Sequence, residues 1–152
     1  MVELLDSWLL PSDVALEFGS GRSTKWFAQR INHLVSVEHD PLWFEQVKTD
    51  PQASDLNVDY RLNEDGSTGA PDSQYVEVAR SIPLKSLDFC LVDGVARDHC
   101  ALAVLDKLKP GGALIIDNVN WFIPREKPGF APNSRGLQDG FSSASWEQLH
   151  RE

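Results

Sequence analysis

Short apolar runs alternate with longer amphipathic segments along most of the chain. Each run is four to six residues long. The runs are rich in Val, Leu, Ile or Phe and are bounded by glycine or polar residues, which is typical of buried strands. They cover residues 14–18, 34–38, 58–62, 87–92 and 113–116. The last two are almost wholly apolar, as expected for strands of a parallel sheet that is covered on both faces.

The segments between these runs carry helical signals. Residues 23–31 place aromatic and aliphatic side chains at helical spacing, and Asp40-Pro41 is a typical start for a helix that should reach about Lys48. A further apolar stripe begins at Ala101 and stops at the Pro-Gly-Gly triplet of residues 110–112. The remaining stretches are residues 64–83, where we assign no element, residues 119–140, which read as a loop or lid, and residues 145–151, which read as the start of a last helix.

Strands that alternate with helices predict an α/β fold with a doubly wound, mostly parallel sheet and helices on both faces. The 152 residues suit one domain with a substantial core, so we assign residues 1–152 to a single domain. Because the chain stops where the last helix begins, we expect the sheet to be truncated at its C-terminal edge. The run at 113–116 would then be an exposed edge strand, which a homo-oligomer would cover.

Charge and composition limit the kinds of binding partner and the cellular compartment that we expect for this protein. The formal net charge is −9, whereas a protein that binds duplex nucleic acid needs a basic surface, so we expect no nucleic-acid partner. No apolar run is long enough to cross a bilayer, and the first residues lack the pattern of a signal peptide. Cys90 and Cys100 have no metal-type spacing and suit a reducing compartment. We therefore expect a cytoplasmic protein without a membrane anchor, and both cysteines to fill the core.

Polar residues and glycines directly follow the predicted strands. In a doubly wound sheet, ligands bind beyond the carboxyl ends of the strands, at the point where the strand order reverses. The residues that should converge there are residues 19–21, Glu38, Asp65, Asp93 and the pair Asp117-Asn118. We therefore expect one ligand site built from these strand ends.

The glycine loop after the first strand excludes one ligand and favours another. A phosphate-binding P-loop needs Gly-Lys-Ser/Thr after four spacer residues, and this spacing is missing after Gly19. A dinucleotide loop needs a third glycine where this chain has Thr24, although Glu38 stands where a ribose-binding acid belongs. Glu17 at the end of the first strand would repel a pyrophosphate and attract an ammonium or sulfonium group. The pattern therefore favours S-adenosylmethionine and leaves an NAD-linked oxidoreductase as the alternative.

Four segments resemble the class I S-adenosylmethionine-dependent methyltransferases. They are ALEFGSGRST, VSVEHD, LDFCLVDG and LKPGGALIIDNV, which keep the order and spacing of the family's motifs over residues 14–118. The resemblance implies a Rossmann-like domain that transfers a methyl group to a small-molecule acceptor. The chain is most similar to small bacterial-type members of unassigned substrate, and the C-terminal strands of the family are missing from it.

The resemblance also implies roles for individual residues near the methionine part of the cofactor. Gly19, Ser20 and Gly21 would let the backbone pass close to it. Glu17 would hold the amino group, directly or through water. The other two expected contacts are Ser23 and Thr24, which would cap the next helix or touch the carboxylate.

On the nucleoside side, Glu38 would bind the ribose hydroxyls and His39 would flank the adenine. Asp65 would accept a hydrogen bond from the adenine amino group, and Asp93 would lie near the reacting methyl group as the catalytic residue. For His39 a surface position is an equal alternative. For Asp65 the alternative is ordinary turn chemistry.

Three further features leave alternatives open. Asp93, Asp117 and Asn118 match the metal ligands of catechol-type O-methyltransferases, but Ala96 replaces the lysine of that family, so we assign no metal ligand. Arg97 is either a surface charge, which we favour, or a contact to an anionic substrate. His99 is a candidate base if its helix faces the cleft.

The aromatic residues and the short C-terminus also leave choices. Trp26 and Trp43 should pack in the protein, whereas Trp121-Phe122 would either touch the acceptor or pack. Because the domain ends early, a catalytically deficient module that binds the cofactor and acts through protein interaction is the alternative to an enzyme.

Overall fold

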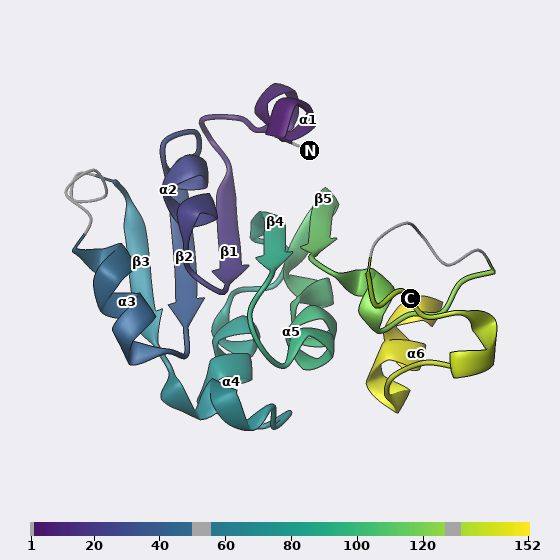
Figure 1. The fold of residues 1–152 in the computed structure, drawn as a ribbon. Helices are drawn as coiled ribbons and strands as arrows, with labels where there is room; N and C mark the ends of the chain where they lie inside the picture. The colour runs from purple at the N-terminus through teal and green to yellow at the C-terminus, as the bar shows by residue number, and fades with distance from the viewer. Residues whose placement is uncertain (1, 50–55, 127–131) are drawn as a thin grey trace.

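The computed structural model describes residues 2–49, 56–126 and 132–152 of the chain (Figure 1). Strands and helices alternate along it, as predicted. The strands are β1 (Val14–Phe18), β2 (His33–Glu38), β3 (Val58–Leu62), β4 (Leu87–Val92) and β5 (Leu108–Ile116). The helices are α1 (Val2–Trp8), α2 (Arg22–Ala28), α3 (Pro41–Lys48), α4 (Gln74–Ser81), α5 (Arg97–Val104) and α6 (Ala144–Arg151).

The strands form one sheet in the order β3-β2-β1-β4-β5, and every pairing between neighbours is parallel. The chain runs outward from β1 to β3 and then returns to the other side of β1 to form β4 and β5. The strand order therefore reverses between β1 and β4, where their carboxyl ends leave a crevice for a ligand. Glu17 of β1 pairs with Ser36 on one side and with Leu91 on the other.

Helices cover both faces of the sheet. Alternate residues of each strand point to opposite sides, so each face presents its own apolar side chains to a layer of helices. On one face, Leu16 and Phe18 pack with a cluster from α4 and α5 that includes Tyr75. On the other face, Ala15 packs with residues of α1 and α2 that include Phe27. The prediction of a doubly wound α/β sheet is thus confirmed. Cys90 and Cys100 are both fully buried in the first of these clusters, as expected.

The helix α4 lies in a stretch where the sequence predicted no element. Its residues Tyr75, Val76, Val78 and Ala79 are buried. The Ser73 hydroxyl accepts a hydrogen bond from the Val76 amide and caps the helix. Because the surrounding residues are rich in turn-forming types, the sequence pattern does not predict this short apolar stripe.

The fifth strand is longer than the sequence predicted. It begins at Leu108, which pairs with Leu87, and continues through the Pro-Gly-Gly triplet, where the register with β4 is irregular, to Ala113, which pairs with Phe89. The preceding helix ends at Val104 and is followed by a 3-10 turn, η2 (Leu105–Lys107). The triplet was expected to separate a helix from a strand, but it lies inside the strand.

The C-terminal segment contains more structure than a loop. It forms the 3-10 turns η3 (Val119–Trp121) and η4 (Leu137–Asp139), and α6 then packs against α5 on the β5 side of the molecule (Figure 1). The Ser143 hydroxyl donates to the Asp98 carboxylate, and Phe122 stacks on Trp146 with ring centroids 4.6 Å apart. Phe122 therefore packs within the protein. Within the described sheet, β5 is an edge strand, as predicted.

No helix in the described part of the chain has the length and apolarity needed to span a membrane.

Candidate functional site

A cleft of about 310 Å³ lies at the carboxyl ends of β1, β2 and β4. We call it the central cleft. Its lining residues are Gly19, Ser20, Glu38, His39, Asp40, Trp43, Asp93 and Gly94. The structure therefore brings together five of the residues that the sequence predicted for the cofactor, from three different strand ends.

Two glycines allow the strand ends to approach each other. Gly19 has a φ of +95°, and a Cβ atom there would lie 2.8 Å from the Gly94 nitrogen. A Cβ on Gly94 would clash with the Tyr75 hydroxyl and would lie 3.0 Å from the Gly19 nitrogen. Gly21 is different, because its nearest neighbour would be the Trp43 ring at 3.9 Å. The packing of the protein thus requires glycine at Gly19 and Gly94 and leaves room at Gly21.

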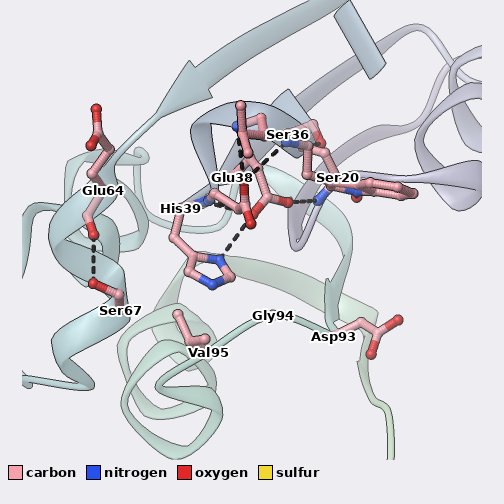
Figure 2. Close-up of polar contacts among 12 residues, drawn as sticks. Ser20, Ser36, Glu38, His39, Glu64, Ser67, Asp93, Gly94 and Val95 are labelled. Carbon is pink, nitrogen blue, oxygen red and sulfur yellow. Dashed lines mark hydrogen bonds and ion pairs between the residues drawn. The ribbon is translucent and has the colours of Figure 1, made fainter. Parts of the chain in front are cut away.

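The Glu38 carboxylate organises the floor of the cleft (Figure 2). Its Oε2 accepts a hydrogen bond of 3.0 Å from the Ser20 amide, and its Oε1 accepts from the amides of His39 and Asp40. The Nδ1 atom of His39 lies 2.9 Å from the same Oε1. Because the Ser20 amide is the one donor to Oε2 among the described residues, this oxygen keeps room to accept another hydrogen bond.

Glu17 is fully buried and does not line the cleft. Its carboxylate accepts hydrogen bonds from the hydroxyls of Ser23 (2.5 Å), Thr24 (2.5 Å) and Ser36 (2.7 Å). Burial raises the pKa of Glu17 from 4.5 to about 7, although the three hydroxyl donors oppose the shift, and the Asp93 charge adds to it. A ligand in the central cleft would therefore make no direct contact with Glu17.

Ser23 and Thr24 hold Glu17 at the start of α2. The Thr24 hydroxyl also accepts a hydrogen bond of 2.7 Å from the Gly21 amide, so it caps the helix as predicted. Neither residue lines the central cleft. The direct contact to a ligand carboxylate that was expected of them stays a prediction.

Trp43 lines the central cleft, although the sequence predicted that it packs in the protein. Its indole Nε1 donates a hydrogen bond of 2.5 Å to the Ser20 carbonyl, and the residue is 45% exposed. It follows Asp40, whose carboxylate caps α3 by accepting from the amides of Leu42 and Trp43. The position of this tryptophan in the first turn of α3, five residues after the end of β2, was the available signal.

Asp65 is engaged by the protein itself. Its carboxylate oxygens accept hydrogen bonds from the amides of Gln74 (2.6 Å) and Tyr75 (3.2 Å) at the start of α4. It does not line the central cleft. The observed contacts are those of a capping residue, and the contact to adenine stays a prediction.

Arg97 joins the ends of β4 and β5, and the interpretation of this residue as a surface charge was wrong. Its side chain is 15% exposed. Its guanidinium donates to the carbonyl of Gly94 (2.9 Å), the carbonyl of Asp117 (2.5 Å) and the Asn118 side-chain oxygen (3.2 Å). It also contacts the Asp93 carboxylate at 3.2 Å. Sequence alone gave no sign of these contacts, because they join two separate strand ends, and Asp117 lies 20 residues after Arg97 in the chain.

The turns that Arg97 joins are conformationally strained. Ala96 and Asn118 both have left-handed backbone conformations, with φ values of 47° and 54°. Burial and the neighbouring Asp117 carboxylate raise the pKa of Asp93 above its ordinary value, and the Arg97 guanidinium opposes the shift. The two aspartates are therefore held close together by a resident cation.

These residues do not fit a metal ion as they stand. Asp93, Asp117 and Asn118 all face the Arg97 guanidinium, which fills the place where a divalent cation would contact them. Among residues 2–49, 56–126 and 132–152, no group of three or more His, Cys, Asp or Glu side chains is placed to hold a metal.

We predict that Arg97→Lys lowers the free energy of unfolding by about 1–3 kcal/mol. A lysine has no planar fork, so it cannot reach both strand ends at once, and carbonyl groups would lose their donors. Urea unfolding measures the change. The control is Arg151→Lys, because Arg151 is 67% exposed and its change should stay within about 0.5 kcal/mol. Equal losses in the two variants would contradict the role of Arg97.

Comparison with known proteins gives matches at the level of structure. No protein-family model matches the chain, and no curated protein matches it in sequence. A methyltransferase-like protein from Silicibacter pomeroyi matches 99% of this chain over 91% of its own length, with a TM-score of 0.58 and 21% identity. At this identity the likeness establishes the fold.

Two further neighbours are longer proteins. An S-adenosylmethionine-dependent methyltransferase from Thiobacillus denitrificans, solved with S-adenosyl-L-homocysteine, matches 91% of this chain with a TM-score of 0.56 and 14% identity. A precorrin 8w decarboxylase from Methanobacterium thermoautotrophicum matches 76% of it with a TM-score of 0.58 and 21% identity. The chain spans 56% and 59% of their lengths, respectively.

The chain has a class I methyltransferase-like fold. The resemblance seen in the four sequence segments is thus confirmed for the fold. In this methyltransferase-like fold, the central cleft lies at the reversal of strand order between β1 and β4, which is where such a sheet binds its ligand.

Proposed function

We propose that this protein is an S-adenosylmethionine-dependent methyltransferase. The observation that carries the proposal is the charge of the central cleft. The described residues that line it include the carboxylates of Glu38, Asp40 and Asp93, and they include no lysine or arginine. Such a site favours a ligand with a cationic sulfonium and ammonium group over one with a pyrophosphate. The methyltransferases among the structural neighbours support the same choice.

The residues present fit this cofactor. The free acceptor position on Glu38 Oε2 would bind a ribose hydroxyl, and the imidazole of His39 would flank the adenine. The loop from Gly19 to Gly21 would pass along the methionine part. Glu17 does not line the cleft and would act indirectly, by holding the hydroxyls of Ser23 and Thr24 at the start of α2. The volume of about 310 Å³ lies within the usual range for small-molecule sites.

The chemistry requires little of the protein beyond positioning. Bound S-adenosylmethionine would supply its sulfonium methyl group to the acceptor lone pair and keep the C–S electron pair as S-adenosylhomocysteine, while the acceptor would lose a proton. Asp93 would take that proton, since its raised pKa makes it a better base than an ordinary aspartate. Arg97 would act as a positioning residue by fixing Asp93 in place.

Thermal unfolding with S-adenosylhomocysteine tests the proposed cofactor. At about 100 times its dissociation constant, the ligand should add roughly 2.7 kcal/mol to the free energy of unfolding. NADH at the same concentration serves as the control and should give no shift. A shift with NADH alone would favour the oxidoreductase alternative, and no shift with either ligand would contradict the proposal.

A further inference from the structure

A second, apolar cavity of about 370 Å³ lies beside the central cleft, between α1, α2 and the ends of β4 and β5. We call it the α1–α2 pocket. Its walls are apolar and come from Leu5, Trp26, Phe27, Leu91, Ile115 and Ile116. Polar side chains are present at Arg22, Ser23, Asp93 and Asp117. Its size and lining are typical of a site for a small organic molecule.

Asp93 connects this pocket to the central cleft. It is the residue shared by the linings of the two cavities. Figure 2 shows that its carboxylate extends away from Glu38 and His39, which lie in the central cleft. A ligand in the α1–α2 pocket would therefore meet a ligand in the central cleft at this side chain.

The polar residues of the pocket mainly offer hydrogen-bond acceptors. Asp93 and Asp117 contribute carboxylates. The Ser23 hydroxyl donates its proton to Glu17 at 2.5 Å, so its oxygen is left to accept. Arg22 is the exception, but it is an exposed residue at the first position of α2. The complementary ligand has an apolar body and one hydrogen-bond donor.

We propose that the α1–α2 pocket binds the methyl acceptor, and that the acceptor is a small apolar or aromatic molecule whose amine or hydroxyl group points at Asp93. This inference rests on the proposed function, because it assigns the acceptor of that same site. The apolar walls bind the body of the acceptor. Asp93 and Asp117 accept hydrogen bonds from its nucleophilic group and orient it toward the central cleft.

Another cavity is a weaker candidate for the acceptor. It has a volume of about 440 Å³, lies at α5 and α6, and is lined by Trp121, Phe122, Trp146 and His99 among others. The residue that it shares with the central cleft is Gly94, which has no side chain. It therefore offers no group that would face both ligands.

Calorimetric titration of the whole protein with tryptamine tests the inference. Tryptamine has an aromatic body and one amine, and indole-3-propionate has the same ring with a carboxylate instead. With the protein saturated with S-adenosylhomocysteine, we expect tryptamine to bind at least about tenfold more tightly than indole-3-propionate. Equal binding, preference for the carboxylate, or no binding of tryptamine would overturn the proposal.

Amino-acid substitutions show which of the two cavities tryptamine occupies. Ile115→Trp fills the pocket and should abolish tryptamine binding, while Asp117→Asn keeps the shape and should weaken it about tenfold. Both should still bind S-adenosylhomocysteine. Trp121→Ala is the matched control in the other cavity and should bind tryptamine normally. Loss of binding in Trp121→Ala, with normal binding in Asp117→Asn, would overturn the proposal even if Ile115→Trp does not fold.

Failure of the cofactor and failure of the pocket give different results. If S-adenosylhomocysteine does not bind, the proposed function fails, and tryptamine titration of the protein alone then decides whether the pocket takes this class of ligand. If S-adenosylhomocysteine binds and tryptamine does not, only the assignment of the acceptor fails.

Discussion

Gly19→Ala should lower the free energy of unfolding by about 2–4 kcal/mol. Two effects add at this position. The φ of +95° is a conformation that L side chains rarely adopt, and the new Cβ would lie 2.8 Å from the Gly94 nitrogen and 3.0 Å from the Asp93 carbonyl carbon. These neighbours are backbone atoms of the strand end that forms the cleft, so relieving the contact must widen the crevice. Urea unfolding measures the loss, and S-adenosylhomocysteine binding should fall with it.

Gly21→Ala is the matched control two positions along the same loop. Its φ is 176°, which any residue adopts, and the nearest atoms to a Cβ would be those of the Trp43 ring at 3.9 Å. We expect the free energy of unfolding to change by less than about 1 kcal/mol, since the substitution mainly restricts the unfolded chain. Comparable losses in the two variants would show that strain at Gly19 is not the cause.

The second large effect concerns Glu17 and pH. Folded protein keeps Glu17 protonated up to a pH of about 7, whereas in unfolded protein the group titrates near 4.5. Between these values the folded state binds more protons, so the stability from neutral Glu17 is fully present below pH 4.5 and is lost as pH rises through 7. At about 1.4 kcal/mol per pKa unit, the loss approaches about 3 kcal/mol. Urea unfolding at a series of pH values across this window measures it.

Glu17→Gln removes the titrating group while keeping an acceptor for the serine and threonine hydroxyls. The difference in unfolding free energy between this variant and the wild type should therefore change with pH across the same window. Glu45→Gln is the control, because Glu45 lies exposed on α3, and its difference from the wild type should stay nearly constant. A constant difference for Glu17→Gln as well would show that Glu17 is ionised throughout.

Much of the fold could be predicted from local sequence. Short apolar runs bounded by glycine and polar residues located β1, β3 and β4 at their observed bounds, and the Asp40-Pro41 pair located α3. These signals are local, because alternation, capping and turn chemistry act over a few residues. The alternation of strands with helices then predicted the doubly wound sheet, and with it the convergence of Gly19, Glu38 and Asp93.

The contacts made by the site residues depended on the tertiary structure. Sequence placed Glu17 near a ligand, but only the packing of α2 on the sheet surrounds it with three hydroxyls and buries it completely. The contacts of Arg97 could not be predicted from the sequence, because its partners come from two separate strand ends that only the pairing of β4 with β5 brings together. The sequence placed Asp65 near a ligand, but in the structure its carboxylate accepts hydrogen bonds from amides at the start of α4.

The sequence by itself thus determined which residues stand at the strand ends, because strand length and glycine position are set by neighbours along the chain. Only the tertiary structure decided which of them face a cavity and which are used by the protein. That choice depends on burial and on hydrogen-bond partners from distant elements, which no local pattern encodes. The same distinction separates the central cleft, whose residues could be predicted, from the α1–α2 pocket, whose walls come from two helices and two strands.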